Sequence, residues 1–183
     1  NKYPLKVTGL LNQIGPGAKN AFLSGMAHSK YDIVLLCTID EMFIIPKIER
    51  MFKIIANQNY DLVSGTRYSK GGVRYGGFFS ARLLSYLSNK ILKVFTNIGL
   101  SDSTTGFKMF KKKIFDHIVL ESSNAGWSFA LEISVKSYKQ KLKLTEVPIT
   151  AVDRVFGGES TYKNNAFKWI KEYLRWFLFC IFK

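Results

Sequence analysis

Side chains that often build catalytic or metal centres are scarce in this sequence, which has only two cysteines and two histidines. Cys37 and Cys180 lie far apart, so they indicate neither a disulfide framework nor a zinc site, and we expect a reducing compartment. His28 and His117 lack the spacing of metal ligands. No Ser/His/Asp order or G-x-S-x-G elbow is present. The sequence therefore gives no sign of a disulfide scaffold, a zinc centre or a serine hydrolase.

Acidic residues are also few: 13 Asp and Glu stand against 27 Lys and Arg, a formal net charge of +14. Such a surplus favours an anionic partner, which could be nucleic acid, anionic lipid or a phosphorylated small molecule. A nucleic-acid module should carry basic residues and aromatics along one face. Here the arginines follow predicted strand ends instead, so we do not expect nucleic acid as the partner.

Long hydrophobic runs are absent too. The tail at 167–183, "FKWIKEYLRWFLFCIFK", ends in an apolar stretch far short of the ~20 residues that span a bilayer. Its mixture of aromatic and basic residues suits a helix lying in a membrane interface, while apolar periodicity is equally typical of a helix packed on a core. Both interpretations stay open. The chain has no N-terminal signal peptide and begins at Asn1 without Met, so we interpret it as a fragment.

With 47% hydrophobic residues, the chain is that of one globular domain in which apolar runs alternate with helical patterns. This alternation predicts an α/β fold with a mainly parallel sheet flanked by helices. The run at 32–39, "DIVLLCTI", has the length of a strand buried on both faces. The predicted strands are 5–11, 32–39, 61–67, 106–111 and 143–152, and the predicted helices are 15–29, 45–58, 77–98, 127–140 and the tail.

Polar segments follow the predicted strands. In open α/β sheets, ligands bind beyond the carboxyl ends of the strands, so these segments are candidates for a site binding a divalent cation and phosphates. Asp40 could instead cap a helix, and Arg67 could be a surface residue. The candidates are Asp40 and Glu41 in "TIDEMF", Arg67 and Lys70 in "GTRYSKGG", and Asp153, Arg154 and Lys163 in "VDRVFGGESTYK".

A polar island at 101–110, "SDSTTGFKMF", separates the long helix from a lysine run. Asp102, Ser103 and Gly106 are ordinary turn formers, Gly because it tolerates positive φ. As a surface turn, the island should tolerate Asp102→Asn with a change in stability within about 0.5 kcal/mol.

Five segments in this order resemble a known family. They are "GPGAKNAFLSGMAHSKYDIVLL", "YDLVSGTRYSKGG", "ARLLSYLSN", "SDSTTGFKMFKKKIFDHI" and "EVPITAVDRVFGGES". Together they are similar to the family-2 glycosyltransferases that resemble dolichyl-phosphate mannose synthase and other polyprenyl-phosphate sugar transferases. The resemblance covers about residues 6 to 163.

The resemblance implies a GT-A fold, a nucleotide-sugar donor, Mg²⁺ or Mn²⁺, and a polyprenyl phosphate acceptor at an anionic membrane surface. It implies an inverting hexosyltransferase on the cytoplasmic face, peripheral or anchored by a segment outside this sequence. The same fold acting on a polysaccharide or another glycan, and a non-catalytic basic module, are the alternatives.

The resemblance also assigns roles to individual residues. Asp40 matches the second Asp of a D-x-D metal motif, Thr38 stands at the first position, and Glu41 is the carboxylate that could compensate. Asp102 corresponds to an Asp near the reacting centre, with Arg67 near the phosphates. The remaining substrate-binding positions are Arg82 and Ser85 at the lipid phosphate and Arg154 and Lys163 in a closing loop.

The resemblance further divides the chain. Residues 1–163 would form the transferase domain without its first strand–helix unit, which helps to bind the base. Residues 164–183 would form the aromatic and basic membrane-interface helix.

Overall fold

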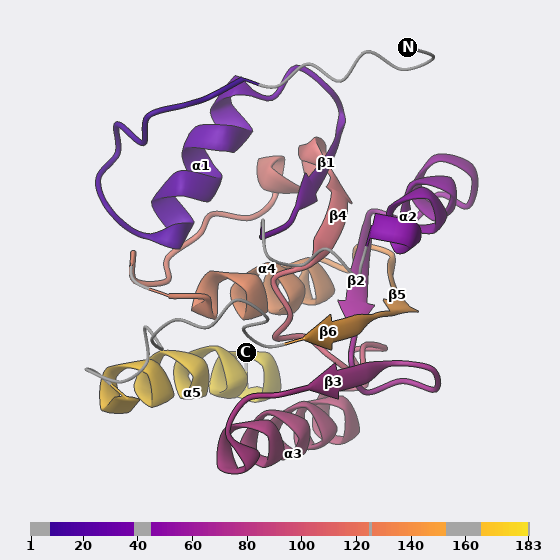
Figure 1. The fold of residues 1–183 in the computed structure, drawn as a ribbon, viewed down its shortest axis with the longest axis vertical. Coiled ribbons are helices and arrows are strands. Elements are labelled where there is room, and N and C mark those ends of the chain that lie inside the picture. The colour runs from indigo at the N-terminus through magenta and orange to yellow at the C-terminus, as the bar shows by residue number, and fades with distance from the viewer. Residues whose placement is uncertain (1–7, 39–44, 125, 153–165, 183) are drawn as a thin grey trace.

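The computed structural model describes residues 8–38, 45–124, 126–152 and 166–182. Figure 1 shows an α/β arrangement in which strands β1, β4, β2 and β5 form a central sheet. The strands are β1 (Ile33–Leu36), β2 (Leu62–Thr66), β3 (Val73–Tyr75), β4 (Lys108–Lys111), β5 (Leu144–Pro148) and β6 (Thr150–Val152). The helices are α1 (Ala18–His28), α2 (Ile45–Asn57), α3 (Phe79–Thr96), the 3₁₀ helix η2 (Lys112–Asp116), α4 (Ser128–Lys139) and α5 (Ala166–Phe182).

The central sheet is mixed. β2 and β5 are parallel, with Thr66 opposite Pro148, while β4 runs antiparallel to both of its neighbours, β1 and β2. Lys108 at the start of β4 stands opposite both Leu36 and Ser64. The amino end of β4 therefore lies at the same edge as the carboxyl ends of β1, β2 and β5, and this edge receives the segment that precedes β4.

The two faces of the sheet are covered by different helices, because successive strand side chains point to opposite faces. Leu62 and Phe110 pack with α1 and α4 on one face. Their neighbours Val63 and Met109 pack with Met51 and the rest of α2 on the other. Because apolar side chains alternate between the two faces of the sheet, each face is covered by its own helical layer.

A third apolar cluster joins α3, α4 and α5 and includes Leu92, Leu131, Trp176 and Cys180. Trp176 and Cys180 are each 1% exposed, so the inner side of α5 belongs to the core. Its outer side remains exposed, with Phe167 and Phe182 among the exposed residues. The core interpretation of the tail is therefore confirmed for the inner side of α5, and the membrane-interface interpretation stays a prediction for its outer side. In the part of the chain that the structure describes, no helix is long and apolar enough to cross a membrane.

The predicted elements correspond to observed ones with two exceptions. The segment predicted as one strand at 143–152 forms two, β5 in the central sheet and β6 in a separate two-stranded sheet with β3, and the amino-terminal end also differs. The predicted strand at 5–11 is wrong for residues 8–11, which are irregular, and residues 5–7 lie outside the described ranges. The strand predicted at 32–39 is β1, which is shorter and only partly buried, since Leu36 alone is buried. Among the described strands β1 pairs with β4 alone, so its residues are less buried than their hydrophobicity predicts.

Candidate active site

The polar island is not a surface turn: the side chain of Asp102 is 0% exposed. The Arg67 guanidinium donates from Nε to Asp102 Oδ2 at 2.6 Å and from Nη2 to Oδ1 at 2.9 Å. The backbone N–H of Arg67 also donates to Oδ2, at 3.2 Å. This two-pronged geometry fixes the guanidinium in position and direction. The surface-turn premise of the tolerance expectation is therefore wrong, and we expect replacement of Asp102 to reduce stability.

The charge of Asp102 is maintained in spite of its burial. Burial raises the pKa of this carboxyl, but attraction by Arg67, its hydrogen bonds and the nearby Lys108 outweigh that effect, so the pKa lies below its ordinary value. The Arg67 side chain keeps 13% of its surface exposed. The pair thus combines a buried anion with a cation that reaches the protein surface.

Thr104 extends the Asp102 pair toward α3. It donates to Asp102 Oδ1 from its backbone N–H and from Oγ1, at 3.3 and 3.0 Å. Its hydroxyl receives Arg67 Nη2 and Asn89 Nδ2, both at 3.0 Å. Asn89 Oδ1 in turn accepts from the buried backbone N–H of Ser103 at 2.7 Å. Asn89 of α3 thereby fixes the backbone of Ser103 in the middle of the turn.

The start of the turn is held by β5. Glu146 accepts from the backbone N–H and from the hydroxyl of Ser101, at 2.7 Å each. The Ser101 hydroxyl is also 2.7 Å from that of Thr66, the last residue of β2. These contacts join two parallel strands to the turn, β2 through its last residue and β5 through its middle residue.

Lys108 lies beneath the turn and is fully buried. Its Nζ donates to Ser64 Oγ at 3.0 Å and to the carbonyl oxygen of Ser103 at 3.3 Å. Burial lowers the pKa of Lys108 to about 7, against the attraction of Asp102. Lys108, Asn89 and Glu146 were not among the predicted site residues. A lysine within the apolar run of a central strand, next to a polar island, is the signal that could have identified the first of them.

Gly106 is required for a reason other than its backbone angle, which is not positive. A Cβ at this position would stand 2.8 Å from Cζ3 of Trp127, just before α4. The turn therefore needs glycine because α4 approaches it closely, and the explanation from positive φ is wrong.

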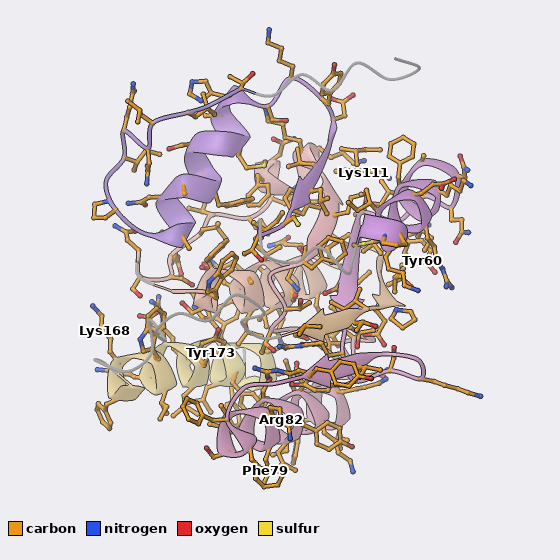
Figure 2. All side chains as sticks on the ribbon, viewed as in Figure 1. Tyr60, Phe79, Arg82, Lys111, Lys168 and Tyr173 are labelled. Carbon is orange, nitrogen blue, oxygen red and sulfur yellow. The ribbon has the colours of Figure 1, made fainter. Side chains whose placement is uncertain are left out.

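The structure brings three of the predicted residues together. Ser85 on α3 accepts a hydrogen bond from Tyr68 OH at 2.8 Å and lies 3.5 Å from Thr104 Oγ1, which connects it to Arg67 and Asp102. Tyr68 also lies beside Arg67, whose Cζ is 5.1 Å from the ring centroid. Arg82 is one turn earlier on α3, with its guanidinium 5.9 Å from the ring of Phe79 (Figure 2).

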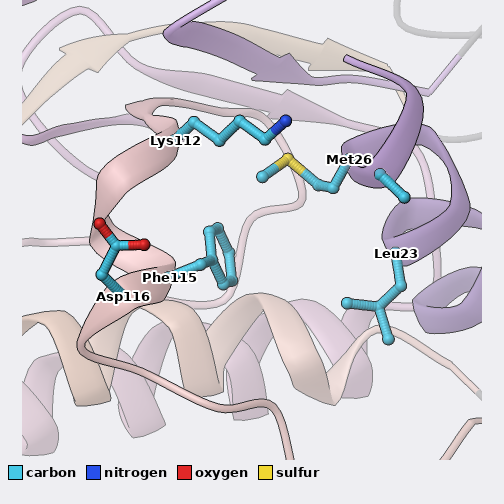
Figure 3. A pocket seen from close by; sticks show the side chains of 6 residues that line it. Leu23, Met26, Lys112, Phe115 and Asp116 are labelled. Atoms are coloured by element: carbon cyan, nitrogen blue, oxygen red, sulfur yellow. The ribbon is translucent and has the colours of Figure 1, made fainter. Parts of the chain in front are cut away.

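Lys70 is exposed, and the remaining predicted residues lie outside the described ranges: Asp40, Glu41, Asp153, Arg154 and Lys163. Among the described residues, no group of three or more His, Cys, Asp or Glu side chains could hold a metal ion. A pocket of about 240 Å³ between α1 and η2 contains none of the site residues (Figure 3). It is lined by Leu23, Met26, Ala27, Lys112, Phe115 and Asp116.

Two curated proteins are similar to this chain in sequence. A polyprenol monophosphomannose synthase of Mycolicibacterium smegmatis is 23% identical over 150 residues, covering 80% of this chain and 56% of the relative. An undecaprenyl-phosphate mannosyltransferase of Micrococcus luteus is 22% identical over 145 residues, covering 77% and 59%. The chain thus spans less than two thirds of either relative.

Solved structures confirm the fold. Glucosyl-3-phosphoglycerate synthase of Mycobacterium tuberculosis, in complex with Mn²⁺, UDP and phosphoglyceric acid, superposes with a TM-score of 0.64 at 12% identity. The match covers 92% of this chain and 55% of that one. The expected GT-A fold, with a sheet flanked by helices and a C-terminal helix, is therefore confirmed. The sequence predicts a mainly parallel sheet; the observed sheet is mixed, since β1, β2 and β5 run in one direction and β4 runs against them. The model of the family described as glycosyl transferase family 2 matches residues 1–119, and the chain belongs to this family.

Proposed function

We propose that this chain is the catalytic domain of a transferase that moves a sugar from a nucleoside diphosphate to a polyprenyl phosphate, inverting the anomeric centre. The observation that carries the proposal is the buried Asp102–Arg67 pair beyond the carboxyl end of β2, which directs a fixed cation to the edge where ligands of such sheets bind. The names of the two curated relatives support the lipid acceptor.

In the proposed reaction, an oxygen of the acceptor phosphate forms a bond to the anomeric carbon. The bond from that carbon to the diphosphate oxygen breaks, and the nucleoside diphosphate leaves with the electron pair. The acceptor is already an anion, so a strong general base is not required. The protein must instead position both substrates and stabilise charge on the departing diphosphate.

Arg67 is suited to that task because the bidentate contact with Asp102 fixes its guanidinium before any substrate binds. Asp102, being fully buried, acts through Arg67 as a positioning residue. Ser85 and Tyr68 offer hydroxyls beside it for phosphate oxygens. Arg82, Arg154 and Lys163 complete the proposed set of substrate-binding residues.

A divalent cation, Mg²⁺ or Mn²⁺, would neutralise part of the diphosphate charge, and Asp40 and Glu41 are its proposed ligands. The neighbours solved with UDP and Mn²⁺ or Mg²⁺ support this cofactor and a nucleotide-sugar donor. We propose that the chain works on the cytoplasmic face of a membrane, with residues 164–183 contributing to attachment.

Transfer to a glycan is the alternative, and the phosphoglyceric acid bound by the solved neighbour adds a small phosphorylated acceptor to be tested. The experiment incubates full-length protein with a panel of nucleotide sugars and a short-chain polyprenyl phosphate, a polysaccharide or phosphoglyceric acid. We expect sugar to appear on the polyprenyl phosphate, to disappear with EDTA and to return with Mg²⁺ or Mn²⁺.

Arg67→Ala is the inactive control, and Lys30→Ala is the matched control at an exposed cation. Product on the polysaccharide or phosphoglyceric acid alone would replace the proposed acceptor. Absence of transfer to all three would favour a non-catalytic basic module.

A further inference from the structure

Helix α3 has the reverse of the usual amphipathic arrangement, in which the apolar stripe faces the core. Its inward edge includes Ser85 and Asn89, whose polar groups contact the Asp102 turn, together with the buried Leu92. Its outward side carries large apolar residues. These exposed residues, here called the α3 outer face, are Phe79, Leu83, Leu84, Leu87, Ile91, Val94 and Phe95.

The α3 outer face is extensive. At 3.6 residues per turn its members cover nearly half of the helix circumference, interrupted by Ser80 and, near one border, by Lys90. Val94 is 73% exposed and Phe79 is 70% exposed. The aromatic residue before the helix, Phe78, is 65% exposed and continues the same apolar surface. In Figure 2, Phe79 lies at the outer margin of the molecule, directed away from the body of the protein. So much contiguous apolar surface marks a binding site.

The charges of α3 identify what kind of partner it fits. The helix contains three cations, Arg82, Lys90 and Lys93, and no acidic residue. The helical period places all three along one flank of the outer face. An apolar face with a cationic flank is the composition of helices that lie in the plane of a membrane interface, where the cations meet anionic headgroups.

We propose that α3 docks this domain on an anionic bilayer, with its outer face inserted at the boundary between headgroups and acyl chains. A second copy of the chain is the weaker alternative. A symmetric contact of two α3 helices would bring like charges together, and such contacts are unfavourable.

Docking through α3 would place the bilayer next to the candidate site. The same helix that offers its outer face to lipid holds the Asp102 turn through Asn89 and contacts Tyr68 through Ser85. α5, which also exposes apolar residues, packs against α3 and lies beside it in Figure 1. The inference deepens the proposed function and rests on it for the lipid acceptor, but the docking itself is testable by binding alone.

The experiment measures flotation of the 183-residue chain with phosphatidylcholine vesicles, with and without phosphatidylglycerol. The apolar variant is Leu84→Asn/Val94→Asn/Phe95→Asn, and the charge variant is Lys90→Glu/Lys93→Glu. Matched controls at exposed positions outside α3 are Tyr31→Asn/Val119→Asn and Lys30→Glu. Circular dichroism and melting temperature confirm that each variant folds.

We expect the wild type to bind anionic vesicles and added salt to weaken that binding. Each α3 variant should bind vesicles at least about tenfold more weakly, which corresponds to a loss of about 1.4 kcal/mol in binding free energy. The controls should bind as the wild type does. Folded α3 variants that bind like the wild type would overturn the proposal. So would a concentration-dependent dimer in gel filtration that the apolar variant abolishes, because the outer face would then be a contact between copies.

An activity assay separates this inference from the proposed function. Vesicle binding that depends on α3, without transfer to any polyprenyl phosphate, would retain the docking surface and remove the proposed acceptor. Transfer to a short-chain acceptor in the absence of vesicles should be unchanged in the α3 variants, since none of the substituted residues belongs to the site. A loss of that transfer in folded protein would show that α3 serves the site rather than the membrane, and would overturn the docking proposal.

Discussion

Asp102 and Arg67 are 35 residues apart in the sequence, yet three hydrogen bonds join them, two from the guanidinium and one from the backbone N–H of Arg67. The carboxylate is fully buried, and the Arg67 side chain keeps 13% of its surface exposed. The anion therefore acts as a fixed support, and the cation is the member of the pair that can meet a ligand.

Asp102→Asn should reduce both turnover and stability. The amide cannot match two donors of Arg67, so we expect turnover to fall roughly 10²–10³-fold. We expect the free energy of unfolding to fall by about 3 kcal/mol, because a largely buried cation loses its partner. Steady-state kinetics and denaturant unfolding measure the two effects. Lost turnover with unchanged stability would mean that the carboxylate acts on the substrate and not through Arg67.

A double-mutant cycle should isolate the interaction within the pair. Arg67→Ala alone leaves the Asp102 anion buried without its main partner, so the double variant Arg67→Ala/Asp102→Ala should lose less stability than the two single losses combined. We expect a coupling free energy of about 2–3 kcal/mol from urea unfolding of the four proteins. Additive losses would show that the two side chains contribute independently.

Asn89→Ala should loosen the turn from the side of α3. It leaves the buried backbone N–H of Ser103 without its acceptor, which costs about 1–3 kcal/mol. Turnover should fall as the turn that carries Asp102 loses its fixed geometry. Lys90→Ala, at the exposed neighbouring position, is the control and should leave stability and turnover of a short-chain acceptor without vesicles near wild type. Equal effects of the two substitutions would point to the helix as a whole.

Lys108 should make stability depend on pH in the alkaline range. Its pKa is about 7 in the folded protein against 10.5 for an ordinary lysine. Between these values the unfolded chain binds the extra proton, so the contribution of Lys108 to stability rises with pH from about 7 to about 10.5. The unfolding free energy of the wild type, measured relative to that of Lys108→Met, should therefore rise over this range. Lys90→Met, at an exposed lysine, should give a constant difference, and a constant difference for Lys108→Met would contradict the prediction.

Asp40→Asn tests the proposed metal ligand. An amide is a neutral and weaker ligand for Mg²⁺ or Mn²⁺, so metal-dependent transfer should be nearly abolished while the melting temperature stays close to wild type. Titration of activity with each cation, in both proteins, is the measurement. Unchanged activity would leave Asp40 with the role of a helix cap.

The sequence predicts most elements because their apolar residues recur at helix or strand spacing. The helices at 18–28, 45–57, 79–96 and 128–139 all lie within the ranges expected from that spacing. The direction of β4 could not be predicted, since an apolar run has no signature of strand direction. Local composition also gave the wrong environment for Asp102. Short polar segments usually form surface turns, and burial here depends on the guanidinium of Arg67, the residue that follows β2.

The candidate site could be predicted only for residues that stand out within a short segment of sequence. Arg67 follows a strand and Asp102 belongs to a conspicuous polar island, so both could be selected from short segments. Asn89 and Glu146 act through contacts that cross 14 and 45 residues of sequence. Nothing in their immediate neighbourhood distinguishes them from an ordinary helix asparagine or strand glutamate.

The antiparallel position of β4 also governs how the sheet can open. β1 and β2 are not adjacent; each is hydrogen-bonded to β4, which stands between them. Opening of β4 would release β1 from the sheet and, in the same event, free the turn that precedes β4. Amide protons of Phe110 and Lys111 should therefore exchange with solvent only in the slowest, global class of openings. On this view the Asp102 turn has the same lifetime as the centre of the sheet, far longer than that of an ordinary surface loop.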